Sequence, residues 1–216
     1  MGGSGGFHNG LKYVYLNGYD YFWIMDDDGV SEKNCLEKLI NVAQKGFYYV
    51  APMLYTYEGI AHFPETLIVK EDIVDHCGGP FNAILLSRLL ISKIGLPNKY
   101  YFIWGDEFEY INRIHESYLH TALVINAIHY HKKTEDKKGL EKRIFFKVRN
   151  LIWSARLSKG IVRGKLNNYF SISFYILKMF IHYLIRLKFV PLWNLLKGVF
   201  RGMTFSLRKL REGGML

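Results

Sequence analysis

Two short apolar runs with a helical pattern between them constrain the fold of this chain more than any other feature. Residues 21–25 are aromatic or aliphatic without a break, which is typical of a buried strand. Residues 31–45 then repeat apolar positions with a helical period, and we expect Ser31 to cap that helix. A second apolar run follows at 47–54. Strand, helix and strand in this order predict an α/β sheet with parallel neighbours.

The remaining segments extend this pattern without an internal repeat. Glycine-rich residues 2–6 favour either a loop that leads into a helix or a flexible Gly/Ser linker. The other expected elements are a helix over 10–18, an irregular loop over 56–80, a strand and helix within 81–97, an aromatic segment and a helix from about 107 within 100–118, a strand over 121–131 and a charged connector over 132–143.

Charge divides the chain into two parts. Residues 1–136 contain 11 Lys and Arg against 17 Asp and Glu, a net charge of −6, whereas 137–216 contain 18 against 2, a net charge of +16. We therefore predict an acidic catalytic domain over 1–136 and a basic tail over 137–216 with an anionic partner. The two cysteines form no disulfide framework or zinc motif, which favours a reducing, cytoplasmic setting.

The tail alternates apolar and basic residues between 144 and 212. No uncharged apolar run reaches the roughly 18–20 residues of a spanning helix. One expected helix separates its two kinds of side chain: the basic side carries Lys178, His182 and Arg186, and the apolar side carries Phe174, Leu177, Ile181, Leu184 and Ile185. This separation predicts a helix in the interface of an anionic membrane, with an ordinary helix packed on the domain as the alternative. The long aliphatic residues argue against nucleic acid as the partner of this charge.

Three consecutive carboxylates follow the first apolar strand. Asp26 and Asp28 lie one residue apart at a strand end, which is where ligands bind in α/β sheets. Grouped carboxylate oxygens suit Mg²⁺ or Mn²⁺, and a cation would offset the repulsion between them. An acidic turn that binds no ion is the alternative, since Asp and Gly are common turn residues.

Two later motifs carry further titratable side chains. The stretch "WGDEFEY" contains Asp106, Glu107 and Glu109, where acidic residues favour a helix start, but aromatic neighbours also raise a carboxyl pKa and suit a general base. His129 and His131 leave the expected strand over 121–131, and either one could complete an oxygen-rich metal site or lie at the surface.

Together these motifs resemble glycosyltransferase family 2 proteins with the GT-A fold, and in particular their galactofuranosyl- and rhamnosyltransferase branch. The resemblance covers about residues 1–150 and rests on five motifs in the same order. They are "GGSGGFHNG", the "DDD" of 26–28, "FNAILLSRLLISKIGLP", "FIWGDEFEY" and "IHYHK". It implies a Rossmann-like mixed sheet flanked by helices, and an inverting transfer of a galactofuranose- or rhamnose-type sugar from a nucleotide-sugar donor to a cell-surface glycan or lipid-linked acceptor.

The resemblance assigns donor-side roles to matching positions. Asp26 and Asp28 would bind the divalent metal, Mn²⁺ or Mg²⁺, with His131 as third ligand and His129 as the second candidate. Asp27 would lie near the donor sugar, and the glycine motif, with Gly5 and Gly6, would contact the donor.

On the acceptor side, Glu107 occupies the position of the general base, Asp106 lies beside it and Trp104 would face the acceptor sugar. This chain has Glu where many relatives have Asp as the base, so Asp106 is the second candidate for that role. Ala83 stands where the family has a glycine after "FN".

One departure concerns the start of the chain. In the family, strands and helices that bind the nucleotide base precede the glycine motif, whereas here Met1 stands where they would end. We therefore expect a partial GT-A domain with unpaired sheet edges, which favour oligomers. We also expect a peripheral location on the inner face of the cell membrane.

Two alternatives come from other classes. A haloacid-dehalogenase-like phosphatase fits "FWIMDDDGV", but the later motif "GDEFEY" has Tyr110 where such a phosphatase needs a carboxylate. A catalytically inactive, membrane-associated remnant of a transferase is the non-enzymatic alternative.

Overall fold

The computed structural model describes residues 2–56, 59–62, 69–70, 72–75, 78–131, 137–160 and 165–216. The chain divides into two compact units. Unit 2 contains 9–96 and 113–134, and unit 1 contains 1–8, 97–112 and 135–215. The unit with the basic tail thus also includes the glycine motif and the "WGDEF" motif. The predicted division at residue 136 stays a prediction, and each unit is described below by itself.

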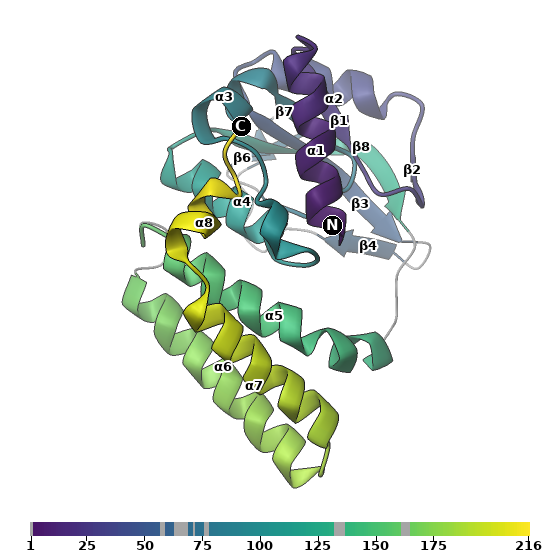
Figure 1. Cartoon of the computed structure of the whole chain (residues 1–216). Coiled ribbons are helices and arrows are strands. Elements are labelled where there is room, and N and C mark those ends of the chain that lie inside the picture. Colours follow the sequence, from purple (N-terminus) through teal and green to yellow (C-terminus); the bar gives the residue numbers. More distant parts are fainter. Residues whose placement is uncertain are drawn as a thin grey trace. The chain divides into compact units, whose positions relative to one another are not determined.

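Unit 2 is built on one mixed sheet (Figure 1). Its central order is β1-β7-β3-β8-β6-β5, β2 pairs with β8 and β4 pairs with β3. The strands of the described residues are β1 (Tyr21–Ile24), β2 (Gly29–Ser31), β3 (Tyr49–Thr56), β4 (Gly59–His62), β5 (Val69–Lys70), β6 (Ile73–Asp75), β7 (Ile84–Ser87) and β8 (Thr121–His131).

The expected parallel pairing of the first two strands is wrong, because β7 lies between β1 and β3 and is antiparallel to both. The two strands still run in the same direction. Among the described pairs, only β3 and β8 are parallel neighbours. Their register shifts between Pro52, opposite Val124, and Met53, opposite Ile128, so β8 has three surplus residues at 125–127.

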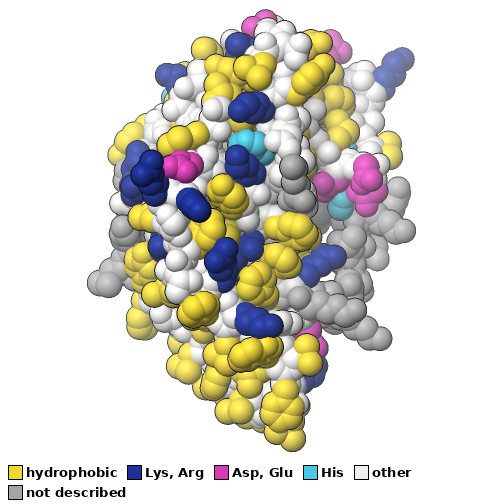
Figure 2. Space-filling model, viewed as in Figure 1, with side chains coloured by type: hydrophobic (Ala, Val, Ile, Leu, Met, Phe, Trp, Pro, Cys, Tyr) yellow, Lys and Arg dark blue, Asp and Glu magenta, His cyan; other side chains and the backbone are white. Residues whose placement is uncertain are grey.

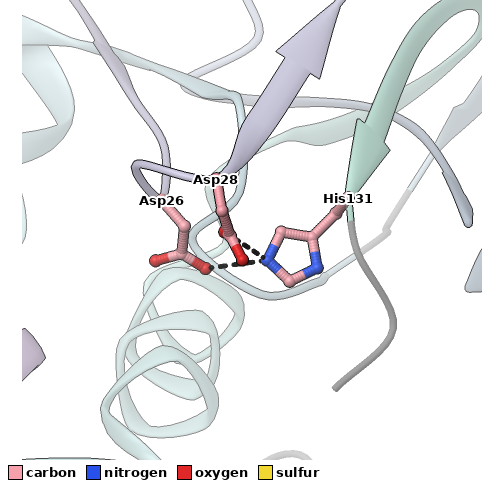
Figure 3. A group of neighbouring side chains, drawn as sticks. All are labelled: Asp26, Asp28 and His131. Atoms are coloured by element: carbon pink, nitrogen blue, oxygen red, sulfur yellow. Dashed lines mark ion pairs between the residues drawn. The ribbon is translucent and has the colours of Figure 1, made fainter. Parts of the chain in front are cut away.

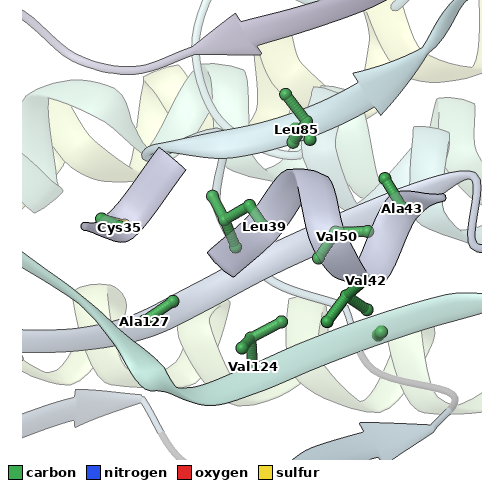
Figure 4. Close-up of a cluster of buried hydrophobic side chains, with 9 residues drawn as sticks. Cys35, Leu39, Val42, Ala43, Val50, Leu85, Val124 and Ala127 are labelled. Atoms are coloured by element: carbon green, nitrogen blue, oxygen red, sulfur yellow. The ribbon is translucent and has the colours of Figure 1, made fainter. Parts of the chain in front are cut away.

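Helix α2 (Cys35–Ala43) packs on this sheet and forms its core (Figure 4). The helical period predicted its apolar face. The contributing side chains are Cys35, Leu39, Val42 and Ala43 of α2 with Val50, Leu85, Ala122, Val124 and Ala127 of the strands. The expected helix start at Ser31 is wrong. Ser31 ends β2, and its hydroxyl hydrogen-bonds with Nδ1 of His129 at 2.7 Å, so its side chain is not available as a cap.

The segment expected as an irregular loop, 56–80, contains the short strands β4, β5 and β6 among its described residues. Strand β6 pairs antiparallel with β8, opposite 122–124, and its Val74 is buried. These strands are two to four residues long, so no apolar alternation of useful length marks them in the sequence.

The glycine motif lies in a helix rather than in a loop or linker. Helix α1 spans Gly2–Leu16 and begins beside Phe102, whose carbonyl accepts a hydrogen bond from the amide of Ser4 at 3.3 Å. Gly2 has φ +66°, and a Cβ there would lie 2.1 Å from the Phe102 oxygen. Glycine is therefore needed at position 2 for this close approach of two backbones. This explains why Gly2 begins the helix, although glycine otherwise disfavours helices.

The predicted strand and helix within 81–97 are confirmed. Strand β7 leads directly into α3 (Arg88–Ile94), and the Ser87 hydroxyl accepts a hydrogen bond from the amide of Leu90 at 3.2 Å, as an N-cap does. A 3-10 turn, η1 (Lys99–Tyr101), then precedes α4 (Asp106–Glu116), which starts one residue before the predicted position.

The rest of unit 1 is helical (Figure 1). Its helices are α5 (Lys137–Leu157), α6 (Lys165–Ile185), α7 (Phe189–Thr204) and α8 (Leu207–Glu212). The expected connector over 132–143 is therefore helical from Lys137, and 132–136 lie outside the described residues. No helix in the described part of the chain combines the length and hydropathy that a membrane crossing requires.

Helices α5 and α7 approach closely because α7 presents glycines to α5. A Cβ on Gly198 would lie 2.7 Å from the Phe145 oxygen, and one on Gly202 would lie 2.8 Å from the Ile152 side chain. The core of the helices consists of Ile144, Val148 and Ile152 of α5, Tyr183 of α6 and Leu195 of α7. The predicted α/β class is confirmed, with a mixed sheet and packed helices that are consistent with a partial GT-A fold.

The departure at residue 83 makes a testable prediction. Ala83 is fully buried with φ +56°, a left-handed conformation that costs a residue with a Cβ about 1–2 kcal/mol. Ala122, buried in β8, has no such strain. Both Ala→Gly changes remove a buried methyl group, but only Ala83→Gly relieves strain. We expect both variants to have a lower unfolding free energy than wild type in urea denaturation. The loss for Ala83→Gly should be smaller than the loss for Ala122→Gly by about 1–2 kcal/mol. Equal losses would contradict the strain.

Candidate metal centre and general base

Asp26, Asp28 and His131 point toward one another in unit 2 (Figure 3). Nε2 of His131 lies 3.0 Å from Oδ1 of Asp28 and 3.6 Å from Oδ2 of Asp26. Both aspartates are about half exposed, whereas His131 is partly buried. Within the described residues, these are the His, Cys, Asp and Glu side chains that lie close enough together to hold a metal ion.

The pairing of β2 with the end of β8 creates this group. Gly29 lies opposite His131 in the antiparallel register, so the turn that follows β1 is brought to the carboxyl end of β8. A side chain at Gly29 would not fit, because a Cβ there would lie 2.3 Å from Nε2 of His129. Glycine at this position therefore permits the contact between the two strands.

His129 is a structural residue in this arrangement. It is fully buried, with Nδ1 at 2.7 Å from the Ser31 hydroxyl and Nε2 at 2.8 Å from Oδ1 of Asn82. Burial lowers its pKa, as does the nearby His131. Since both ring nitrogens are already hydrogen-bonded, the geometry favours His131 over His129 as a ligand. The sequence did not indicate the roles of Ser31 and Asn82.

The three side chains fit a small divalent cation. Their ligand atoms all lie within 4.8 Å of one another, and ligand atoms around Mg²⁺ or Mn²⁺ are about 3–4 Å apart, so small side-chain rotations suffice. Two carboxylates leave positions for further oxygen ligands. Asp27 is exposed and does not belong to this group.

Unit 1 contains the second acidic group, at the start of α4. Asp106 and Glu109 are buried, and Glu107 is partly buried with its Oε2 accepting a hydrogen bond from the Gly105 amide at 3.1 Å. Burial, and after it the charge and hydrogen bond of the adjacent Asp106, together raise the pKa of Glu107 to about 8, against the opposing effect of backbone hydrogen bonds. The sequence also predicted a raised pKa for a carboxyl group of this motif, from its aromatic neighbours. The main cause of the raised pKa of Glu107 is its burial.

The turn before α4 is held in an unusual conformation. Phe102, Trp104 and Gly105 all have positive φ, at +69°, +62° and +86°. Asn150 of α5 stabilises them, because its buried amide group donates to the carbonyls of Tyr101, Ile103 and Trp104.

Arg149 supports the same turn. Its Nε donates to Oδ1 of Asn150 at 2.9 Å, and its Nη2 donates to the Tyr101 carbonyl at 2.6 Å. The sequence interpretation missed both residues. The only signal for them is an adjacent polar pair inside an otherwise apolar stretch of helix.

Trp104 borders an apolar cavity of about 270 Å³ within unit 1. Its lining residues are Trp104, Gly105, Phe108, Lys147, Asn150, Leu151 and Ser154. The guanidinium carbon of Arg143 lies 5.2 Å from the centre of the Trp104 ring. A partly exposed aromatic face beside a cavity is a suitable surface for a ring-shaped ligand.

The two donor-side glycines lie within α1, also in unit 1. Gly5 is buried, and Gly6 is exposed with nothing within 4 Å of a hypothetical Cβ. Their assignment to the donor stays a prediction, as do the roles of Asp27, Trp104, Asp106 and Glu107.

Comparison with known proteins points to one group of enzymes. The model of the family "Glycosyl transferase family 2" matches residues 1–73. Galactofuranosyltransferase GlfT1 of Mycobacterium tuberculosis is 27% identical over 154 residues, which cover 63% of this chain and 51% of that protein. Galactofuranosyltransferase GlfT1 of Mycolicibacterium smegmatis is 24% identical over 151 residues, which cover 61% and 50%.

These matches confirm the resemblance that the motifs predicted. The family match includes the glycine motif and the aspartates at 26–28, and so argues against a flexible linker at residues 2–6. The chain spans about half the length of these two relatives.

The hydrogen bonds of Asn150 can be tested by substitution. Asn150→Ala would leave the carbonyls of Ile103 and Trp104 without this donor and would remove the acceptor of Arg149 Nε, so we expect the unfolding free energy to fall by at least about 2 kcal/mol. Asn17→Ala is the matched control, because Asn17 is exposed and donates only to the Tyr13 carbonyl in its own helix turn. Chemical denaturation measures both. Similar values for the two variants would show that Asn150 does not hold the turn.

Proposed function

We propose that this chain, which is related to glycosyltransferase family 2, is a metal-dependent inverting glycosyltransferase that moves a sugar from a nucleotide-sugar donor to a glycan acceptor. One observation carries the proposal: Asp26 and Asp28, which follow β1, converge with His131 at the end of β8. The family relationship gives this convergence its chemical meaning, since an acidic cluster alone does not define a reaction.

Asp26, Asp28 and His131 would hold the divalent cation. When bound, the ion would neutralise negative charge on the diphosphate of the donor and of the leaving nucleotide. Imidazole nitrogen suits Mn²⁺ better than Mg²⁺, which prefers oxygen alone, so we propose Mn²⁺ as the favoured ion and Mg²⁺ as a weaker substitute. Asp27, Gly5 and Gly6 are proposed contacts of the donor.

Glu107 would act as the general base. It takes the proton of an acceptor hydroxyl while that oxygen forms a bond to the anomeric carbon of the donor sugar. The bond between that carbon and the diphosphate oxygen breaks at the same time, so the anomeric configuration inverts. A carboxyl pKa of about 8 makes Glu107 a stronger base than an ordinary carboxylate, and Asp106 contributes to that shift. The face of Trp104 would contact the acceptor sugar.

The two relatives suggest the donor. Both are named galactofuranosyltransferases, so we propose a galactofuranose-type sugar as the group transferred, with a rhamnose type as the second candidate. A cell-wall glycan or a lipid-linked glycan would be the acceptor.

The basic helices suggest where the enzyme acts. Residues 137–216 carry 18 Lys and Arg against 2 acidic residues, and they contain α5 to α8. We propose that these helices attach the enzyme to the cytoplasmic face of an anionic cell membrane, with formation of oligomers as a further proposal.

The metal centre is tested directly by Mn²⁺ binding. Asp28→Asn removes one ligand charge from the group, so we expect Mn²⁺ affinity to fall by at least about tenfold in isothermal titration calorimetry. Asp27→Asn is the matched control, because it removes the same charge from the same turn but lies outside the group, and it should bind Mn²⁺ within about threefold of wild type. Equal effects of the two changes, or no Mn²⁺ binding by the wild type, would contradict the proposal and favour an inactive remnant.

The base is tested by the pH dependence of transfer. Because the base must be ionised and its pKa is about 8, kcat/KM should rise about fivefold from pH 7 to pH 8, rise about twofold more by pH 9 and level off above that. Glu107→Gln should lose about 10²-fold or more and remove the rise. Asp106→Asn should move the rise to lower pH, since it removes a charge that raises the pKa of Glu107. A profile that is flat from pH 6.5 to 8.5 in the wild type would exclude Glu107 as base.

A further inference from the structure

The turn that joins α6 to α7 carries a dense group of exposed apolar side chains. Five of the seven residues from 184 to 190 are large, hydrophobic and exposed. The exposed fractions are 46% for Leu184, 76% for Ile185, 69% for Leu187, 67% for Phe189 and 73% for Val190. We call residues 184–190 the hairpin tip. Monomeric proteins rarely leave such a group uncovered, so it indicates a surface that binds something apolar.

The backbone of the hairpin tip is held firmly. The amide of Lys188 donates to the Tyr183 carbonyl at 2.9 Å, and the amide of Leu187 donates to the Leu184 carbonyl at 3.1 Å. Tyr183 is buried, and Lys188 forms an ion pair with Glu141 of α5. The apolar side chains are therefore presented to solvent by an ordered turn.

Leu187 adds a further sign of function. Its φ is +51°, a conformation in which glycine or asparagine would be less strained. We take this strained, exposed leucine as a further reason to infer that its side chain contributes to binding.

The exposed apolar surface continues from the hairpin tip along both helices. On α6 it includes Phe170, Phe174, Leu177 and Ile181, and on α7 it includes Trp193, Leu196, Phe200 and Met203. The predicted apolar side of α6 is thus exposed. Figure 2 shows hydrophobic side chains gathered over the end of the two helices where α6 meets α7 in Figure 1, with Lys and Arg between them.

Charge identifies the partner. Residues 165–216 contain nine Lys and Arg and one acidic residue, Glu212. Exposed basic side chains lie along the apolar surface, among them Lys178, Arg186, Lys197 and Arg201. A second copy of this surface would bring like charges together, whereas an anionic bilayer offers acyl chains to the apolar side chains and phosphates to the basic ones.

We propose that the hairpin tip inserts into the acyl-chain boundary of an anionic bilayer, with Arg186 and the basic residues of α6 and α7 on the headgroups. This rests on the proposed membrane attachment and specifies its depth and orientation. In place of one helix that lies flat, a rigid helical hairpin enters by its end, with Ile185, Leu187, Phe189 and Val190 as the inserted side chains.

The test is co-sedimentation with vesicles of phosphatidylcholine that contain 30% phosphatidylglycerol. We expect the triple variant Ile185→Ser/Phe189→Ser/Val190→Ser to partition at least about tenfold more weakly than wild type. The matched control is Tyr13→Ser/Leu16→Ser, which removes side chains of similar exposure, 69% and 68%, from α1. It should partition within about twofold of wild type. Circular dichroism and Mn²⁺ affinity check that each variant keeps its fold.

A second measurement reports insertion itself. A polarity-sensitive fluorophore attached at Ile185→Cys, in a Cys77→Ser background, should shift to the blue when vesicles are added, and the same label at Leu16→Cys should not. No shift at 185 would overturn tip insertion even if the protein binds vesicles.

The outcomes separate the proposed insertion of the hairpin tip from the proposed membrane attachment of the enzyme. Binding of the wild type and the triple variant with equal strength would overturn insertion alone, whereas no binding by the wild type would overturn membrane attachment as well. A wild-type dimer that the triple variant converts to a monomer, with vesicle binding unchanged, would show that the hairpin tip binds a second copy and would also overturn insertion. None of these readouts depends on sugar transfer.

Discussion

The candidate metal centre depends on one buried histidine that binds no metal in this arrangement. His129 hydrogen-bonds to Ser31 on one side and to Asn82 on the other, and so fixes β2 and the start of the β7 segment against β8. Its ring occupies the space that a side chain at Gly29 would need. Because Gly29 and His131 are partners in the ladder, this packing brings the carboxylate of Asp28 to His131.

A comparable arrangement supports the candidate base in unit 1. There Asn150, assisted by Arg149, donates hydrogen bonds to the carbonyls of a turn whose residues have unfavourable backbone conformations. In both units a buried polar side chain from a regular element fixes a segment that lies next to the candidate site residues. A buried polar group is costly unless its hydrogen bonds are made, so such groups hold their neighbours in a defined position.

The sequence predicted the elements whose signals are local. The apolar run of β1, the strand and helix within 81–97 and the periodic face of α2 were all correct, because each depends on residues within a few positions of one another. Asp26, Asp28 and His131 were also named in advance, although two of them are more than 100 residues from the third and the resemblance was needed to join them.

The errors arose where tertiary contacts override local preference. Ser31 has the properties of a helix cap but is bound to His129, and the helix of the glycine motif begins where Gly2 allows the backbone of Phe102 to approach closely. Strands β4 to β6 are too short to show a period. Asn150 lies in the basic tail, which local patterns assigned to a different role from the "WGDEF" motif that it supports.

The surplus residues of β8 have a consequence for the chemistry at its end. Successive side chains of a strand point to opposite faces of the sheet. Because the bulge at 125–127 adds three residues, an odd number, each side chain of β8 beyond it points to the face opposite to the one it would have without the bulge. With an even surplus, Tyr130 rather than His129 and His131 would share the face that now receives the aspartates and Asn82. Whether the bulge adds an odd or an even number of residues thus decides which side chains of β8 lie on this face of the sheet edge. The pairing at 121–124, which precedes the bulge, does not depend on that number.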